Sequence, residues 1–497
     1  MPESVSRGPS RALRWYDYLT INIYWLGLNI SAGTITPVLL PYLVARFVPP
    51  EQKNSYLATA RVAGLAVAMV VQPMAGLFSD RNPSRWGRRR PYILAGTLLD
   101  LVFLLVIGAS PLFLDAPSDR LLQPALGFNT AYGVLLVGIV LLQFSSNLAQ
   151  GATQGLIPDL VPEDHRGRAS GVKAMMELAP AFLAVFIGPL VDAGRTWVAV
   201  GIVMASLFLT MLVTVLFVRE EPLQESPSAS LTGPVLRLIA LTAVFIGVTQ
   251  GAVYLVRSGG AWLAGLETGV GWQVALVGLM GLVGMAGSIL LGVYFGAWVG
   301  IGPEARRRTS FIWWVVNRLL FLAAVGSVEG FALYFLADVL HIPNASTMTT
   351  VLLAVVGVFL LTFALLGGVL SDRVGRKRPL FLAGLVGAAG TFGLLLSTTF
   401  PHVLISGCVI GVGAGVFMAT SWALGTDLAP PEAAGRYLGI SNLAGAGAGI
   451  VGAGIGGPLA DFFNGLRPGL GYQVIFAIYG ALFLFSSLSL SRVQEGR

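Results

Sequence analysis

The sequence predicts an all-α polytopic membrane protein with fourteen transmembrane helices: two pseudo-symmetric six-helix bundles plus two inserted helices. The first observation behind this prediction is composition: of 497 residues, 55% are hydrophobic and only 11% are charged, which is far outside the range of soluble domains. The second is a series of apolar runs, each long enough to cross a bilayer, which takes about 20 residues. The third is a polar loop that occurs once in each half of the chain.

Composition and motifs also exclude several classes of protein. The net charge of +7 would suit a nucleic-acid-binding protein, but the cations gather in short loops between apolar runs, where they set membrane orientation. The single cysteine, Cys408, excludes an intramolecular disulfide and a cysteine-based metal site. The sequence has no phosphate-binding GxxxxGK(S/T) loop, and its histidines lack metal-ligand spacing. We therefore expect no enzyme activity, no metal and no cofactor.

Six apolar runs precede the first strongly polar interval. The basic N-terminus has no short apolar core with a cleavage site, so we expect the first span itself to direct insertion. The interval after the sixth run, REEPLQESPSASLTGP, is typical of a linker. Residues 1–218 are therefore a predicted N-terminal six-helix bundle, with spans at about 17–46, 53–78, 92–114, 131–157, 170–193 and 196–218.

Eight further runs follow the linker. The second copy of the polar loop follows the fourth of these runs, whereas the first copy follows the second span of the chain, so two spans separate the matching halves. We expect a region with two extra helices at 219–310 and a C-terminal six-helix bundle at 311–497. The eight runs lie at about 235–256, 272–300, 311–340, 348–370, 380–399, 402–426, 438–461 and 471–491.

Paired landmarks indicate that a six-helix unit was duplicated, a pattern common in membrane carriers. The polar loop GLFSDRNPSRWGRRRPYILAG, Gly76 to Gly96, returns as GGVLSDRVGRKRPLFLAG, Gly367 to Gly384. Two shorter landmarks are matched in the same order: 159–171 with 427–439, and Gly-Pro-Leu-x-Asp at 188–192 with 457–461.

The cations of the loops predict the orientation of the chain. If the N-terminus is cytoplasmic, the clusters at Arg88–Arg90, Arg306–Arg308 and Arg376–Arg378 all fall on the cytoplasmic side, as the positive-inside rule requires. Both extra spans are needed to place the cluster at Arg376–Arg378 on the cytoplasmic side, because a single inserted span would place it outside. We expect a multi-pass protein of a bacterial plasma membrane with both termini in the cytoplasm.

The two basic loops suggest a cytoplasmic charge-relay gate that closes when the two halves meet. Glycine allows a tight turn in each loop, and the arginines can pair with acids and helix C-termini on neighbouring spans. The alternative is that these cations only fix topology. The candidate gate residues are Asp80, Arg81, Gly87, Arg88, Arg89, Arg90, Asp159, Arg168, Asp372, Arg373, Gly375, Arg376, Lys377, Asp427 and Arg436.

The basic loops resemble the signature between the second and third helices of each half in the major facilitator superfamily. Within it, VVQPMAGLFSDRNPSRWGRRRPYILAG and NLAQGATQGLIPDLVPEDHRGR are most similar to the sucrose and related sugar proton symporters. This resemblance implies alternating access and makes Asp159 a candidate protonatable carboxylate. The chain departs from that branch in its fourteen spans and in GVKAMMELAP of its fifth helix.

Ionisable residues inside spans are costly and are candidates for function. Lys173 and Glu177 are four residues apart on one helix face and can pair, while Pro180 predicts an irregular helix beside Glu177. The pair is a candidate coupling site, or a neutralised tie between helices. Arg61 has no acid in its own span, and Asp100 and Glu177 are its candidate partners.

Further candidates lie in other spans. Glu329 is near the middle of its span, and we expect it to face a cavity, whereas Arg318 lies nearer the cytoplasm and can extend to the surface. Pro37 and Pro41 predict a kink in the first span. Amide side chains could line a polar cavity or tie helices together: Asn22, Asn29, Gln72, Asn147, Gln150 and Gln154.

These observations favour a secondary transporter that moves a small polar solute, of the sugar or glycoside class, by proton-coupled symport. The expected partners are this solute, a coupling proton and the lipid bilayer. The main alternative is a fourteen-helix drug/proton antiporter, which the span count favours. A membrane sensor or scaffold that has lost transport is a third hypothesis, against which the paired aspartates and arginines of both halves argue.

Overall fold

The computed structural model describes residues 13–220, 232–264, 269–301, 308–428 and 434–494. Within these ranges the chain is built of helices and contains no strand. Fourteen of the described helical segments are long and apolar enough to cross a membrane. The predicted all-α polytopic fold is therefore confirmed, and each expected span overlaps an observed one.

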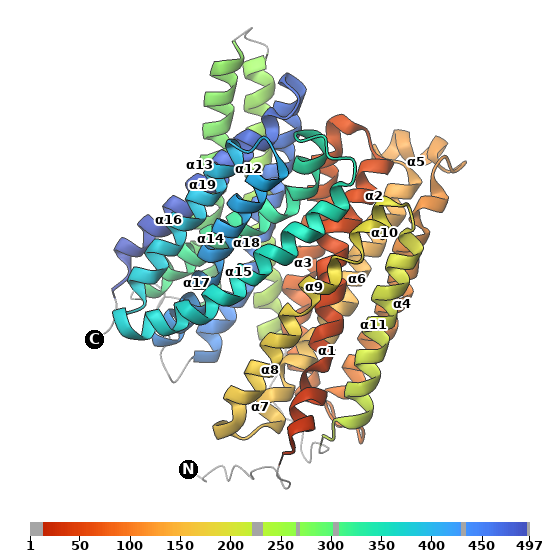
Figure 1. The fold of residues 1–497 in the computed structure, drawn as a ribbon, viewed down its shortest axis with the longest axis vertical. Coiled ribbons are helices and arrows are strands. Elements are labelled where there is room, and N and C mark those ends of the chain that lie inside the picture. Colours follow the sequence, from red (N-terminus) through yellow and green to blue (C-terminus); the bar gives the residue numbers. More distant parts are fainter. Residues whose placement is uncertain (1–12, 221–231, 265–268, 302–307, 429–433, 495–497) are drawn as a thin grey trace.

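The first six spans form what we call the N-terminal half (Figure 1). Its first span is divided into α1, a π-helix η1 and α2, and its fifth into α8, α9 and α10. Its elements are α1 (Trp15–Thr34), η1 (Ile35–Leu39), α2 (Leu40–Phe47), η2 (Pro50–Gln52), α3 (Lys53–Ser79), α4 (Arg90–Ala109), η3 (Ser110–Phe113), α5 (Asp119–Leu126), α6 (Thr130–Gln154), α7 (Leu156–Leu160), η4 (Glu163–His165), α8 (Arg166–Leu178), α9 (Pro180–Ala184), α10 (Gly188–Asp192) and α11 (Thr196–Phe217).

The last six spans form what we call the C-terminal half, and two helices lie between the halves in sequence. The intervening helices are α12 (Thr232–Ala264) and α13 (Val270–Ile301). The C-terminal half consists of α14 (Thr309–Asp338), α15 (Ala345–Val374), α16 (Lys377–Leu395), α17 (Phe400–Leu428), α18 (Ala434–Leu466), α19 (Leu470–Ser489) and η7 (Leu490–Arg492).

Proline accounts for both interrupted spans. Pro37 lies inside the π-helix of the first span, since it cannot donate the hydrogen bond that a continuous α-helix needs. In the fifth span, α8 ends at Leu178 and α9 begins at Pro180, so the predicted irregularity beside Glu177 is confirmed. Both breaks lie where the N-terminal half faces its partner, because α9 and η1 contact α15.

The two halves repeat one pattern of helix packing. In each half the second and third spans contact the fourth, and the sixth contacts the first and the third. In the N-terminal half these contacts are α3 with α6, α4 with α6, and α11 with α1 and α4. In the C-terminal half they are α15 with α17, α16 with α17, and α19 with α14 and α16. Between the halves, the second span of each contacts the fifth of the other: α3 with α18, and α15 with α9 and α10. The packing is thus pseudo-symmetric, as the duplicated sequence predicts.

The inserted helices pack on the outside of this arrangement. α12 and α13 contact each other, and both contact α18; α12 also contacts α3, and α13 contacts α14 and α19. In Figure 1 this pair extends beyond its neighbours at the top of the molecule.

The two ends of the molecule differ in how the halves approach each other. We call the end that carries Arg88 and Arg376 the basic end, and the opposite end, which carries Lys53 and Asp192, the far end. Figure 1 shows the halves side by side at the far end and diverging toward the basic end. The first described helix begins, and the last one ends, at the basic end, where the Lys377 Nζ donates to the Val493 carbonyl at 2.8 Å.

Small residues set the helix spacing in the C-terminal half. A Cβ atom added to Gly415 of α17 would overlap the Leu360 carbonyl oxygen of α15, and one added to Gly413 would lie 2.7 Å from the Ala383 carbonyl oxygen of α16. These two positions lie on opposite sides of α17, because two residues advance a helix by about 200°. α17 is therefore held between its neighbours by direct backbone contact.

We expect Gly415→Ala to destabilise the protein by about 1–3 kcal/mol, the usual cost of overpacking, and to lower the midpoint of thermal unfolding in detergent. Gly368→Ala is the matched control, since a Cβ there meets nothing within 4 Å. Equal midpoints for the two variants would contradict a backbone contact at Gly415.

Candidate functional site

A polar cavity of about 190 Å³ lies in the N-terminal half, between the first, second and fourth spans. It is walled by α1, η1, α2, α3 and α6, so the broken first span forms one side of it. The polar lining residues are Asn29, Ser31, Thr36, Arg61, Gln143, Ser146, Asn147 and Gln150. Asn29, Asn147, Gln150 and Arg61 are among the residues expected from the sequence, whereas Gln143 and Ser146 are not.

The lining suits a ligand with many hydroxyl groups. The amides of Asn29, Gln143, Asn147 and Gln150 each offer donors and acceptors. Helix contacts orient some of them: the Asn29 Nδ2 donates to the Trp25 carbonyl at 2.9 Å, and the Asn147 Nδ2 donates to the Gln143 carbonyl at 2.8 Å. Apolar residues such as Leu28, Ile35 and Leu142 complete the wall. A cavity with amides, hydroxyls and apolar patches can bind a neutral, polyhydroxylated solute.

Arg61 reaches from this cavity to the opposite half. Its Nη2 donates to the Gly326 carbonyl of α14 at 3.1 Å. The guanidinium lies directly on the α14 backbone, because a Cβ added to Gly330 would overlap Nη1. Within the described part of the chain, this buried Nη1 has no hydrogen-bond partner. Arg61 therefore links the halves and keeps one donor available near the cavity.

Glu329 is the acid that is electrostatically coupled to Arg61. Glu329 is exposed on α14, and it is not among the residues that line the polar cavity. The expectation that Glu329 faces a cavity therefore stays a prediction. The expectation that Asp100 or Glu177 is the partner of Arg61 is wrong, because the acid that interacts with Arg61 comes from α14 of the other half.

Asp100 lies in a separate buried site behind the cavity wall. It is fully buried in α4 and accepts hydrogen bonds from the Ser145 Oγ at 2.5 Å and the Ser146 Oγ at 2.8 Å. Its Oδ2 has no partner within the described ranges. Since Ser146 also lines the cavity, Asp100 is separated from the cavity by one side chain.

The Lys173–Glu177 pair forms as the sequence predicts, with the Lys173 Nζ 3.3 Å from the Glu177 Oε1. The Lys173 Nζ also lies 4.2 Å from the centre of the Trp25 ring. Both charged side chains are about one-third exposed, at 30% and 35%. The pair therefore lies on the side of α8 that faces α1.

The remaining candidates inside the spans differ in burial and in the contacts they make. Arg318 does not extend to the surface, because its side chain is buried and its Nη1 lies 3.3 Å from the Ser421 Oγ. Asn22 is an interhelical tie that donates to the Ala169 carbonyl at 3.2 Å. Gln154 is exposed on α6, and neither it nor Gln72 lines the cavity.

At the basic end of the N-terminal half, Asp159 is held between two arginines. It lies 2.6 Å from the Arg88 Nη2 and 2.9 Å from the Arg89 Nε. Arg89 is 6% exposed, also pairs with Asp80, and donates to the Ser79 Oγ at 2.7 Å. These contacts tie the loop after α3 to the ends of α3 and of the fourth span, so the predicted partners of the first arginine cluster are confirmed.

Glu220 completes this network and was not expected from the sequence. Its carboxylate accepts from the backbone amides of Arg89 at 3.1 Å and Arg90 at 3.0 Å, which start α4. It lies over Gly87, which has φ of +98°, and a Cβ there would overlap Oε2. Burial raises the pKa of Glu220, while these amide bonds lower it in part. The feature of the sequence that could have indicated Glu220 is the pair of acidic residues directly after the sixth span.

The second basic loop forms a more open network. Arg376 pairs with Asp372 and lies 3.4 Å from Asp427, and these acids are 69% and 57% exposed. Gly375 has φ of +87°, which confirms the predicted turn. The other candidate gate residues have varied positions. Arg168 and Arg373 are exposed, and Arg90 donates to the Trp86 carbonyl at 3.2 Å. Arg81 also interacts with other groups, and the Arg436 side chain lies outside the described residues. The ion pairs seen among the described residues of the two basic loops each join residues of one half: Arg88 and Arg89 with Asp159, Arg89 with Asp80, and Arg376 with Asp372 and Asp427. The gate between the halves therefore stays a prediction.

Comparison with known proteins shows the family. The sequence model described as Major Facilitator Superfamily matches residues 24–342 and 319–495, which together cover most of the chain. The chain belongs to the major facilitator superfamily. This is a family of transporters rather than enzymes, so the protein is a multi-pass membrane transporter.

Curated relatives in the superfamily are sugar transporters. Sucrose transport protein SUT1 of Oryza sativa subsp. japonica is 38% identical over 115 residues, which are 22% of this chain and 21% of that protein. The general alpha-glucoside permease of Schizosaccharomyces pombe is 28% identical over 222 residues, 43% of this chain and 38% of that protein. The matches thus span less than half the length of these relatives. They confirm the resemblance to the sugar symporter branch.

Solved structures in the superfamily match nearly the whole chain. A peptide transporter POT in complex with sulfate has a TM-score of 0.65 at 16% identity and covers 98% of both chains. A D-xylose-proton symporter has a TM-score of 0.58 at 16% identity and covers 96% of this chain and 97% of the other. At these identities the likeness shows the fold alone.

We expect Asp159→Asn to cost about 1–3 kcal/mol, because it leaves the buried Arg89 with one fewer charged partner. Asp372→Asn is the matched control in the second loop, where an exposed pair contributes about 0–1 kcal/mol. Thermal unfolding of both variants measures the difference. A larger loss of stability for Asp372→Asn would contradict the asymmetry of the two loops.

Proposed function

We propose that this transporter carries a sugar or glycoside across the membrane by proton-coupled symport. The observation that carries the proposal is the juxtaposition of the polar cavity with Arg61 and Glu329, one from each half. The names of the curated relatives, sucrose transport proteins and an alpha-glucoside permease, support the substrate class. The likeness to a D-xylose-proton symporter supports a fold able to perform such transport.

The chemistry of the cavity favours a neutral solute over a cationic drug. Four amide side chains and three hydroxyl side chains line it, together with the guanidinium of Arg61. Sugar hydroxyl groups both donate and accept, so they can satisfy amides in several orientations. A cationic drug would instead meet the positive charge of Arg61, and none of the described residues that line this cavity carries a carboxylate. This favours the symporter over the drug antiporter.

Glu329 is the coupling carboxylate in this proposal. When it is ionised, it attracts the Arg61 guanidinium and holds it on α14. When it accepts a proton from its open surroundings, this attraction is lost, and the free Nη1 of Arg61 can turn to a bound solute. Proton and solute binding are then linked, because both alter the partners of one guanidinium. Asp100, behind Ser146, is the second candidate acid.

The two halves act as the moving units in this proposal, with the solute bound in the cavity of the N-terminal half, beside the Arg61 contact with α14. The hydrogen bonds between the halves lie at the far end and at Arg61, so the described conformation is closed at the far end. The positive-inside rule makes the basic end cytoplasmic, and the cavity then opens inward. The arginine loops approach each other when the basic end closes.

Substrate binding can be tested with a matched pair of glutamines on one face of α6. We expect Gln150→Ala to weaken the apparent affinity for a transported sugar about 3–10-fold, the loss of one hydrogen bond. Gln154→Ala, one turn further along and outside the cavity wall, should change it less than two-fold. Uptake of labelled sucrose, maltose and xylose into proteoliposomes measures this. Export of cationic drugs with no sugar uptake would falsify the proposed substrate class.

Coupling can be tested separately from binding. We expect Glu329→Gln to abolish sugar accumulation driven by an imposed pH gradient while retaining exchange of labelled for unlabelled sugar. Glu177→Gln is the control, because that acid pairs with Lys173 and is not the acid that acts on Arg61. If Glu177→Gln or Asp159→Asn abolishes accumulation and Glu329→Gln does not, another carboxylate is the coupling site.

A further inference from the structure

At the far end, an aspartate of the N-terminal half caps a helix of the C-terminal half. Asp192, the last residue of α10, accepts from the Ser346 amide at 3.1 Å and the Thr347 amide at 2.8 Å. It also accepts from the Thr347 Oγ1 at 2.6 Å. These amides belong to the first turn of α15, where they have no acceptor within their own helix. Asp192 therefore supplies the missing acceptor from the opposite half.

An aspartate of the C-terminal half makes the reciprocal contact. Asp461 of α18 accepts from the Asn54 amide at 3.1 Å, the Asn54 Nδ2 at 2.8 Å and the Ser55 amide at 2.7 Å. These amides start α3, the second span of the N-terminal half. The positive end of each helix dipole strengthens the attraction to a carboxylate. The two contacts thus follow the pseudo-symmetry that relates the halves.

The two aspartates end the same short motif, Gly-Pro-Leu-x-Asp, at 188–192 and 457–461. The glycine of each copy lies against the helix that the aspartate caps. A Cβ added to Gly188 would be 2.7 Å from the Thr347 Cα, and one added to Gly457 would be 2.5 Å from the Asn54 carbonyl oxygen. Glycine therefore allows the approach, and aspartate four residues later makes the hydrogen bonds.

We propose that Asp192 and Asp461 form a reciprocal latch that closes the far end of the transport pathway and sets the balance between its two access states. The inference rests on alternating access in the proposed function. Every bond of the latch joins one half to the other, so it must break for the far end to open. At the basic end, by contrast, the pairs of Arg88 and Arg89 with Asp159 and of Arg376 with Asp372 and Asp427, all among the described residues, lie within single halves and do not oppose separation there.

Two neighbouring contacts between the halves lie beside the Asp461 side of the latch. The Tyr334 OH of α14 donates to the Pro41 carbonyl at 2.9 Å, and the Tyr334 ring lies 4.7 Å from the Lys53 Nζ. The Lys53 Nζ lies 2.7 Å from the Asp338 Oδ1, which joins α3 to the end of α14. The Tyr472 OH donates to the Asp338 Oδ2 at 2.5 Å, within the C-terminal half. The latch at Asp461 therefore has an ion pair beside it, and we expect the loss of Asp192 to open the far end more than the loss of Asp461.

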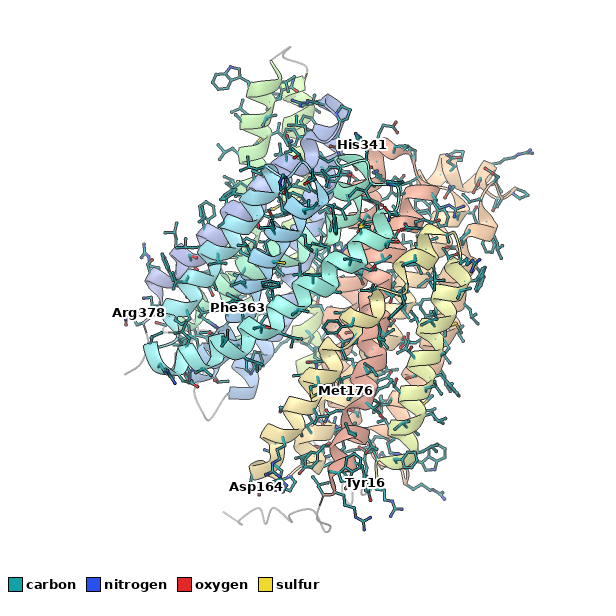
Figure 2. All side chains as sticks on the ribbon, viewed as in Figure 1. Tyr16, Asp164, Met176, His341, Phe363 and Arg378 are labelled. Carbon is teal, nitrogen blue, oxygen red and sulfur yellow. The ribbon has the colours of Figure 1, made fainter. Side chains whose placement is uncertain are left out.

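Distances between spin labels measure the two states directly. In a Cys408→Ser background, Glu51→Cys with Thr399→Cys reports the far end, since these positions lie between the first two spans of one half and between α16 and α17 of the other. Asp164→Cys with Arg378→Cys reports the basic end (Figure 2). All four label positions are exposed. We expect Asp461→Ala to raise the ratio of far-end-open to far-end-closed molecules about three-fold, Asp192→Ala about eight-fold, and the double variant about 25-fold, which are ratios that ordinary helix caps supply.

Two controls separate the latch from general damage. Asp119→Ala removes an aspartate that accepts from the Thr130 amide at 2.6 Å at the start of α6, so it deletes a far-end helix cap within one half. It should leave both distances unchanged. Asp192→Asn and Asp461→Asn should restore the closed far end at least in part, because an amide oxygen also caps helices well.

A second variant tests the same contact with both carboxylates intact. Gly457→Ala places a methyl group 2.5 Å from the Asn54 carbonyl oxygen and should also populate the open far end, while Gly465→Ala in the same helix, which meets nothing within 4 Å, should not. Unchanged distances in the folded Asp192→Ala/Asp461→Ala protein, or a shift equal to that of Asp119→Ala, overturn the proposal. These distances need neither sugar nor a proton gradient, so the latch can fail while the proposed function stands, and the reverse.

Discussion

The contact of Arg61 with the α14 backbone is the constraint on which the centre of the molecule depends. A guanidinium inside a membrane protein needs hydrogen-bond acceptors and a nearby acid. Both come from the opposite half: the Gly326 carbonyl accepts from Nη2, and Glu329 supplies the charge. Gly330 leaves the space that the guanidinium fills. The two halves are therefore joined at the middle by a charge that neither half satisfies alone, beside a cavity that can hold a polar solute.

The two copies of the basic loop differ in structure, whereas the two copies of Gly-Pro-Leu-x-Asp are used alike. At the basic end, the N-terminal copy forms a partly buried network around Arg89 and Asp159, stabilised by Glu220, while the C-terminal copy around Arg376 is exposed. At the far end, both copies of Gly-Pro-Leu-x-Asp make equivalent contacts across the interface. Contacts within a half can diverge after duplication, but a reciprocal interface constrains both of its sides together.

The sequence was enough to name many residues of the candidate site, but not to say which residues contact each other. Sequence spacing was enough for Lys173 and Glu177, since residues four apart on a helix are neighbours. It was also enough to name Asn29, Asn147 and Gln150 as cavity candidates. It could not assign the partner of Arg61, because that acid lies in another half and no local rule relates the two positions. Glu220 was missed because a carboxylate in a linker gives no sign of the helix it will cap.

The sequence by itself determined the fourteen spans, their breaks at proline and the two-fold repeat, because bilayer thickness, the missing proline amide and motif spacing are local properties of the chain. It also indicated the transporter family through loops that are polar against an apolar background. Only the tertiary structure decided which half supplies each partner, where the cavity lies and which end is closed. Those features depend on contacts between helices distant in sequence, at Arg61, Asp192 and Asp461, which arise only when the two halves are packed together.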